Sequence, residues 1–271
     1  MPETDPLSYY QVSGIHGIPF VPWQETSVPS QNRNTGYCTH SSVLFATWHR
    51  PFLCVFEELL VRHATQIASG FTGSQAQRYR DAANRVRLPY WDWASNDLQS
   101  RQPAQLTAYT VSVVRPGPGG APETASINNP LRGYQFTNNN LRSQWMGSGN
   151  FGMTSRTRRQ PPPDMQSSNM AAVDNAMAQG FTSRKNAVYN LFTIPTFSDF
   201  SGTQFNNNGS PNAYNSVESI HNGVHVNCGG QRGHMTSVAH SSVSPSGINP
   251  RIAANLVCVV RPYLHAAPLQ H

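Results

Sequence analysis

The sequence predicts a mainly α-helical domain with long irregular loops, and three observations support this. The first is a helical pattern from about His49 to Ala68, in which apolar residues recur at steps of three and four. The second is composition, because 20 glycines, 21 prolines and only 12% charged residues indicate much loop and few surface ion pairs. The third is length, since 271 residues can bury one sizeable core or two small ones.

The formal net charge of +6 comes mostly from arginine and is dispersed along the chain. The densest basic run, Arg156–Arg159, lies just before three prolines and is interpreted as a solvated loop, so no nucleic-acid partner is expected. No apolar run approaches the roughly 20 residues that span a bilayer, and the first ten residues carry no secretory signal pattern. With four cysteines that suggest no disulfide framework, we expect a cytoplasmic protein without a membrane partner.

Residues 1–35 are expected to form a loop with short ordered pieces. The helix after them is predicted to begin near Trp48 or His49, because proline is expected only in a first helical turn and Pro51 follows closely. The aromatic segment RLPYWDWA (Arg87–Ala94) is predicted to be buried.

Residues 101–170 lack periodicity and are rich in loop-forming residues, so they are predicted to be irregular. A helix is predicted within residues 168–192, and a loop over Phe205–Asn215. The segment Ser216–Gly230 is predicted to form a helix that its two final glycines stop.

His221 and His225 lie four residues apart, which places both imidazoles on one helical face within reach of one metal ion. Glu218, three residues before His221, lies on the same face. A zinc-peptidase site is excluded, because the position of its general base is Asn222, which cannot act as a base. Taken alone, the pair fits capped core histidines as well as a metal site.

His40 and His49 are nine residues apart, and on one continuous helix they would lie on opposite faces, about 900° of rotation apart. Because Pro51 limits the helix, His40 is expected on a preceding loop that can fold back toward His49. The two could then share a metal ion, although each could also be a hydrogen-bonded core histidine. Imidazole-rich sites suit copper, zinc, iron or nickel, and spacing does not choose among them.

Four stretches carry a family resemblance, and they extend from about Tyr9 to Ser237. They are YYQVSGIHGIPFVPW (Tyr9–Trp23), GYCTHSSVLFATWHRPF (Gly36–Phe52), RLPYWDWA (Arg87–Ala94) and SVESIHNGVHVNCGGQRGHM (Ser216–Met235). Together they resemble the fungal tyrosinases, which are type 3 copper proteins like the catechol oxidases and hemocyanins. The resemblance implies a four-helix bundle core that holds a dinuclear copper site.

The resemblance also implies roles for individual residues. His16, His40 and His49 match the ligands of the first copper, CuA, and His221 and His225 match two ligands of the second, CuB.

Glu218 matches a glutamate that holds an ordered water near the coppers. Asn222 matches the residue that helps this water act as a base toward a phenol. Cys38 matches a cysteine that forms a thioether to the imidazole two residues on, His40. His63 and His234 match no ligand position.

The activity implied by the resemblance is oxidation of phenols and catechols to o-quinones by O2, with a role in melanin-type pigment formation. Two further hypotheses remain open. One is a catalytically impaired copper-binding remnant, and the other is an oxygen carrier of the hemocyanin kind. Turnover of catechol separates the oxidase from both of these hypotheses.

The resemblance ends at about Val238, where the family carries a sixth histidine that this chain lacks. We therefore expect a copper-binding domain over residues 1–237, short at its N-terminus, and a non-matching tail over 238–271. The tail is either foreign, through a frameshift, intron or splice variant, or a divergent segment that supplies the missing ligand. CuB is expected to be incomplete and the last core helix of the bundle missing. The candidate replacements are His240, His265 and His271.

Overall fold

The computed structural model describes residues 1–16, 37–97, 101–141, 155–205 and 215–230. Within these residues the chain is mainly helical, as the sequence predicts, and its one sheet is a two-stranded hairpin. The longer helices are α1 (Tyr9–His16), α2 (Phe45–Ser69), α3 (Ala76–Asn84), α6 (Met170–Gln179), α7 (Phe181–Leu191) and α9 (Val217–Gly229). The shorter ones are α4 (Ala104–Thr107), α8 (Phe197–Ser201) and the 3₁₀ turns η2 (Pro118–Gly120), η3 (Pro130–Arg132) and η4 (Thr203–Phe205).

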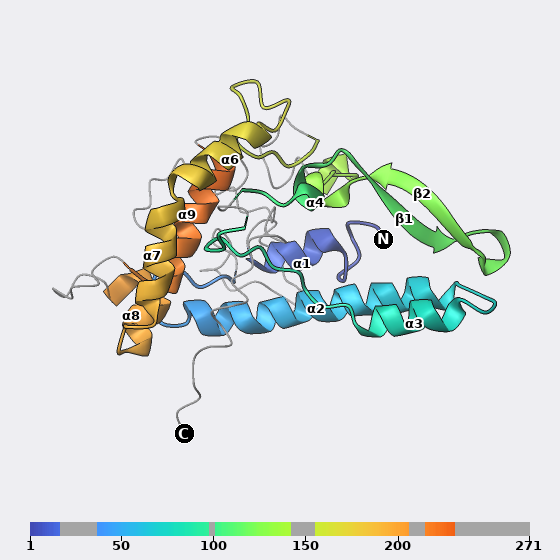
Figure 1. The fold of residues 1–271 in the computed structure, drawn as a ribbon, viewed down its shortest axis with the longest axis horizontal. Coiled ribbons are helices and arrows are strands. Elements are labelled where there is room, and N and C mark those ends of the chain that lie inside the picture. Colours follow the sequence, from blue (N-terminus) through green and yellow to red (C-terminus); the bar gives the residue numbers. More distant parts are fainter. Residues whose placement is uncertain (17–36, 98–100, 142–154, 206–214, 231–271) are drawn as a thin grey trace.

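Helix α2 is 25 residues long and runs along one side of the molecule (Figure 1). The prediction that it begins near Trp48 or His49 is wrong, because it begins at Phe45 and Pro51 lies inside it. Pro51 removes one backbone donor, which would have bonded the carbonyl of Thr47. Both residues are exposed, so water can bond that carbonyl and the helix continues through the proline. His40 lies before the helix in irregular structure, as expected.

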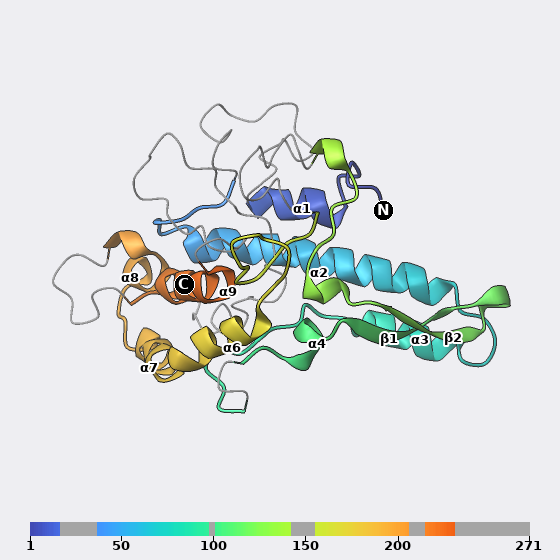
Figure 2. The same cartoon turned by 90° about the horizontal axis from the view of Figure 1, so that it is seen from above.

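The irregular structure predicted for residues 101–170 is wrong in one part, where strands β1 (Thr110–Pro116) and β2 (Pro122–Asn128) form an antiparallel hairpin. The hairpin lies beside α3 and the C-terminal end of α2 (Figures 1 and 2). Gly120, in its turn, has a φ of +82°, and an added Cβ would lie 2.6 Å from the methyl group of Thr72. This turn is also bonded to Thr72 through the carbonyl oxygens of Gly119 and Gly120.

Helices α6, α7 and α9 pack together across the N-terminal end of α2 (Figures 1 and 2). The helix predicted within 168–192 is present as two helices, since Gly180 ends α6 and begins α7. The helix predicted over Ser216–Gly230 is confirmed as α9, which stops at Gly230, a residue with a φ of +63°. The core between these elements includes Val173, Met177 and Val224, all with no exposed surface, and the aromatic segment contributes Trp91 and Trp93.

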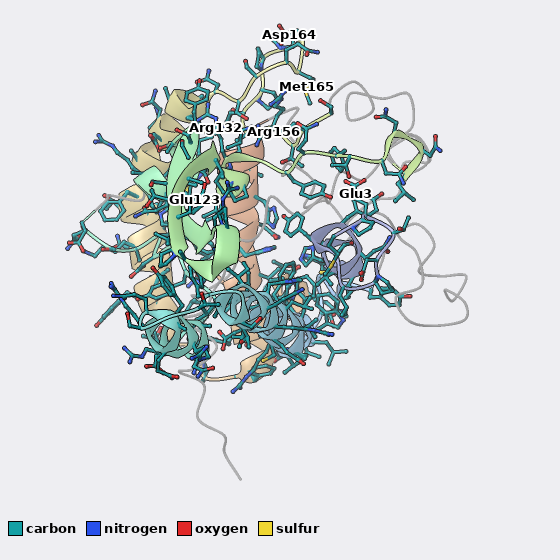
Figure 3. All side chains as sticks on the ribbon, turned by 90° about the vertical axis from the view of Figure 1, so that its right-hand side faces the viewer. Glu3, Glu123, Arg132, Arg156, Asp164 and Met165 are labelled. Atoms are coloured by element: carbon teal, nitrogen blue, oxygen red, sulfur yellow. The ribbon has the colours of Figure 1, made fainter. Side chains whose placement is uncertain are left out.

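Helix α1 lies alongside α2 and packs through Val12 against Phe52, Phe56 and Leu88. The N-terminal segment before α1 is tied down by Glu3, which lies next to α1 in Figure 3 and is only 4% exposed. Its carboxylate accepts hydrogen bonds from the Tyr134 hydroxyl at 2.6 Å and from the backbone amides of Thr137 and Asn138. Burial and the Glu3 carboxylate both raise the pKa of Tyr134 above its usual range.

No helix in the described part of the chain is long and apolar enough to cross a membrane.

Replacement of Pro51 by alanine should stabilise the protein by about 1–2 kcal/mol, because it restores a helical hydrogen bond at an exposed position. Urea unfolding of the metal-free protein measures this. The neighbouring exposed substitution Arg50→Ala is the control and should stay within about 0.5 kcal/mol of the parent. A less stable Pro51→Ala variant would mean that α2 needs the proline in place.

Candidate metal centre

The first group of candidate ligands comes from three different elements. His16 is the last residue of α1, His49 lies in the second turn of α2, and Cys38 and His40 lie in the irregular segment between them. One ligand atom of each lies within 4.8 Å of one ligand atom of every other. The structure thus brings together the three histidines expected at CuA and the cysteine next to them.

The hydrogen bond of His49 determines which of its nitrogens can bind a metal. Its Nδ1 lies 2.6 Å from the carbonyl oxygen of Phe45, one turn earlier in α2. Because a carbonyl only accepts, Nδ1 carries the proton and Nε2 carries a lone pair. That Nε2 lies 3.1 Å from Nε2 of His16, so the two nitrogens could be adjacent ligands of one ion.

The second group lies on α9. Nε2 of His221 and Nε2 of His225 are 2.8 Å apart, and both side chains are buried. Nδ1 of His221 donates to the side-chain oxygen of Asn222 at 3.0 Å, which leaves Nε2 as the lone-pair nitrogen. The spacing of four residues therefore does bring both imidazoles to one point on a helical face.

The two groups face each other. The ring centroid of His221 is 5.7 Å from that of His40 and 5.9 Å from that of His49. Phe45 lies beside both groups, 4.3 Å from the His49 ring and 5.1 Å from the His221 ring, and is 2% exposed. Two metal ions bound by these groups would be neighbours in one site.

The nitrogen positions fit metal ions. An ion bound at about 2.0–2.1 Å to each imidazole nitrogen keeps adjacent ligand atoms roughly 3 Å apart. The separations of 3.1 Å in the first group and 2.8 Å in the second match this requirement. Imidazole donors suit copper, zinc, iron and nickel equally, so the fit does not by itself name the metal.

Glu218 is buried beside the two groups, with 1% of its surface exposed. One carboxylate oxygen accepts a hydrogen bond from the backbone amide of Ser41 at 2.7 Å. The other accepts from the amide of Thr203 at 2.9 Å and from its hydroxyl at 3.2 Å. Glu218 and Asn222 are four residues apart on α9 and therefore share a face.

His63, noted in the sequence, is not part of either group. His63 lies fourteen residues after His49 on α2, roughly 21 Å farther along the helix. His234 lies outside the described residues, as do the candidate replacements His240, His265 and His271. Sequence reasoning missed Phe45, whose spacing of four residues from His49 would have indicated contact had the helix been predicted to start earlier.

A family model described as the common central domain of tyrosinase matches residues 6–246. The chain belongs to the tyrosinase family. It is 35% identical over 256 residues to a tyrosinase of Podospora anserina, covering 90% of this chain and 43% of that protein. It is 29% identical over 253 residues to polyphenol oxidase 4 of Agaricus bisporus, covering 90% of this chain and 38% of that protein.

The fold is also that of known tyrosinases. The structure of recombinant mushroom tyrosinase aligns with a TM-score of 0.77 at 28% identity, covering 94% of this chain and 43% of that one. The mainly α fold with a bundle core, expected from the tyrosinase resemblance, is confirmed. The expectation that the last core helix is missing falls on residues outside those described. The chain spans less than half the length of the two curated tyrosinase relatives compared with it.

Replacement of Phe45 by alanine should destabilise this tyrosinase-family domain by about 3–5 kcal/mol, because it empties a buried position beside the two imidazole groups. Urea unfolding of the metal-free protein is the measurement. Leu44→Ala, at a neighbouring position that is 54% exposed, should change stability by about 0.5 kcal/mol at most. Equal effects of the two substitutions would show that the Phe45 ring is not a core element.

Proposed function

We propose that this protein oxidises phenols and o-diphenols to o-quinones with O2, using two copper ions. The observation that carries the proposal is the pair of facing imidazole groups in a tyrosinase-family domain. In this assignment His16, His40 and His49 hold CuA, and His221 and His225 hold CuB. Bound copper would supply the electron transfer and the binding of O2 that this oxidation needs.

The imidazoles are held so that their lone pairs face the ions. The carbonyl of Phe45 accepts the Nδ1 proton of His49, and the side-chain oxygen of Asn222 accepts that of His221. Such partners fix the ring orientation and the protonation state of a ligand histidine. Because only neutral imidazole binds a metal, copper uptake should weaken in acid.

Proton removal from the phenol is assigned to a water held by Glu218 and Asn222. A carboxylate has about four acceptor positions, and three protein donors occupy positions on Glu218, so one is left for water. A base at this place favours the hydroxylation of phenols as well as the oxidation of catechols. The o-quinones formed would polymerise, which supports a role in pigment formation.

We also propose a thioether between Cys38 and His40. Sγ of Cys38 lies 3.2 Å from Nδ1 and 3.9 Å from Nε2 of the His40 ring. The ring atom between these nitrogens is Cε1, so the sulfur is next to the carbon that the bond would join. The bond would form with loss of one hydrogen from sulfur and one from carbon, and O2, the oxidant of the proposed activity, would take up the two electrons and two protons as hydrogen peroxide. The bond would fix the ring of His40.

A copper-binding protein with impaired catalysis is the second candidate. It is favoured by the second group, which within the described residues offers two imidazoles where the family resemblance implies three. A further ligand would have to come from residues outside those described. Oxygen carriage of the hemocyanin kind would require reversible binding of O2 without turnover.

Copper content and catechol oxidation test the proposal together. We expect the three-imidazole group to retain copper through dialysis and the two-imidazole group to bind it more weakly. His49→Ala should abolish retention, because it removes a ligand, while His63→Ala should leave it unchanged. Both variants are measured by copper analysis after anaerobic loading with Cu(I).

The outcomes separate the candidate functions. Two coppers per chain and quinone formation from catechol support the oxidase. One copper per chain without quinone formation supports the impaired protein and contradicts the oxidase proposal for this chain.

The thioether predicts a mass change. After copper loading in air, the tryptic peptide Asn34–Arg62, which holds Cys38, His40 and Cys54, should lose two hydrogen atoms and take up one iodoacetamide group instead of two. In Cys38→Ser the same peptide should lose no hydrogen atoms and should still take up one iodoacetamide group, on the exposed Cys54. An unchanged peptide mass in a copper-loaded, oxygen-treated protein would contradict the thioether.

A further inference from the structure

We infer that Glu218 is a positioning residue that fixes the loop bearing Cys38 and His40 against α9, and so controls metal affinity at the first group. The inference rests on the proposed metal-dependent function and adds a role for Glu218 besides the one suggested for its water. Glu218 lies on α9, the helix that carries the second group, yet in this role it affects metal binding at the first group.

The hydrogen bonds of Glu218 all go to other parts of the chain. Ser41 is 177 residues away in the sequence, and Thr203 is 15 residues away. Neither of the donors belongs to α9. The carboxylate therefore joins three segments, namely the His40 loop, the segment around Thr203, and α9 itself.

Capping of α9 does not explain this carboxylate. The N-terminus of α9 is capped by Ser216, whose hydroxyl accepts the backbone amide of Ser219 at 3.1 Å. The hydroxyl of Ser219 in turn accepts the backbone amide of Ser216 at 2.8 Å. This reciprocal pair satisfies the helix end, so Glu218 is available for bonds to the other segments.

Ser41, the residue directly after His40, needs such a partner. Its φ is +48°, a left-handed conformation that is unfavourable for a residue with a Cβ. A hydrogen bond to a charged acceptor is stronger than one between neutral groups and can offset that cost. The bond from the Ser41 amide to Glu218 thus holds the backbone turn that directs His40 toward His16 and His49.

The other two segments are already in close contact where Glu218 joins them. A Cβ added to Gly202 would lie 2.5 Å from the carbonyl oxygen of Ser42, so the two backbones touch. The hydroxyl of Ser201 accepts a hydrogen bond from the backbone amide of Ala46 and donates one to the backbone carbonyl of Val43. Glu218 completes this junction from the side of α9, so its loss should release the His40 loop from the second group.

The decisive experiment measures the Cu(I) affinity of the first group in a protein from which the histidines of the second group have been removed. In the His221→Ala/His225→Ala background, Cu(I) affinity is determined anaerobically by competition with a chelator. Addition of Glu218→Gln, which keeps the volume but presents an amide donor to the donors it faces, should weaken Cu(I) binding about 10–100-fold. Addition of Ser219→Ala, which removes one bond of the reciprocal pair at the start of α9 and none of the Glu218 bonds, should leave the affinity unchanged.

A second measurement uses the metal-free chain with only Glu218→Gln, in case the triple variant does not fold. Hydrogen exchange should accelerate at the amides of Ser41 and Thr203, and not at the amide of Ser216. Unchanged Cu(I) affinity or unchanged exchange at Ser41 would overturn the inference. Neither readout requires turnover. A failure of this inference can therefore be distinguished from a failure of the parent chain to oxidise catechol.

Discussion

The hydrogen bond between the Nδ1 of His49 and the carbonyl oxygen of Phe45 is the constraint on which the metal centre depends. It fixes the proton on one nitrogen and presents the other to His16. It requires helical backbone at Phe45, because only a helix places a carbonyl one turn before the imidazole that bonds it. The ring of the same Phe45 contacts His49 of the first group and His221 of the second.

Much of the site could be predicted from the sequence, because its signals are local. The four-residue spacing of His221 and His225 requires one helical face, and two glycines mark the end of that helix. The nine-residue spacing of His40 and His49 required a loop, and the loop is there even though Pro51 does not start the helix. The start of α2 was predicted wrongly because proline is disfavoured inside a helix but not excluded from it. At Pro51 the carbonyl of Thr47, which loses its helical partner, is exposed and can bond water.

The rest could not be predicted, because it depends on contacts between distant residues. The hairpin alternates apolar and small polar residues too weakly to stand out, and its turn residues alone indicate only a loop. Nothing near Glu218 in the sequence indicates that Ser41 and Thr203 are its donors. The partners of Glu3 could not be predicted either, since its donors within residues 134–138 lie far along the chain.

The candidate ligands come from both ends of the described chain, and this affects the order in which folding and metal binding can occur. Within the described residues His16 ends the first helix and His225 lies in the last one, so the two candidate groups meet only after long segments between them have closed. Closure of such long loops is entropically costly and comes late when local helices form first. A nascent chain therefore has not yet brought the two groups together, and a pair of metal ions bound by both would have to enter a domain that is already folded.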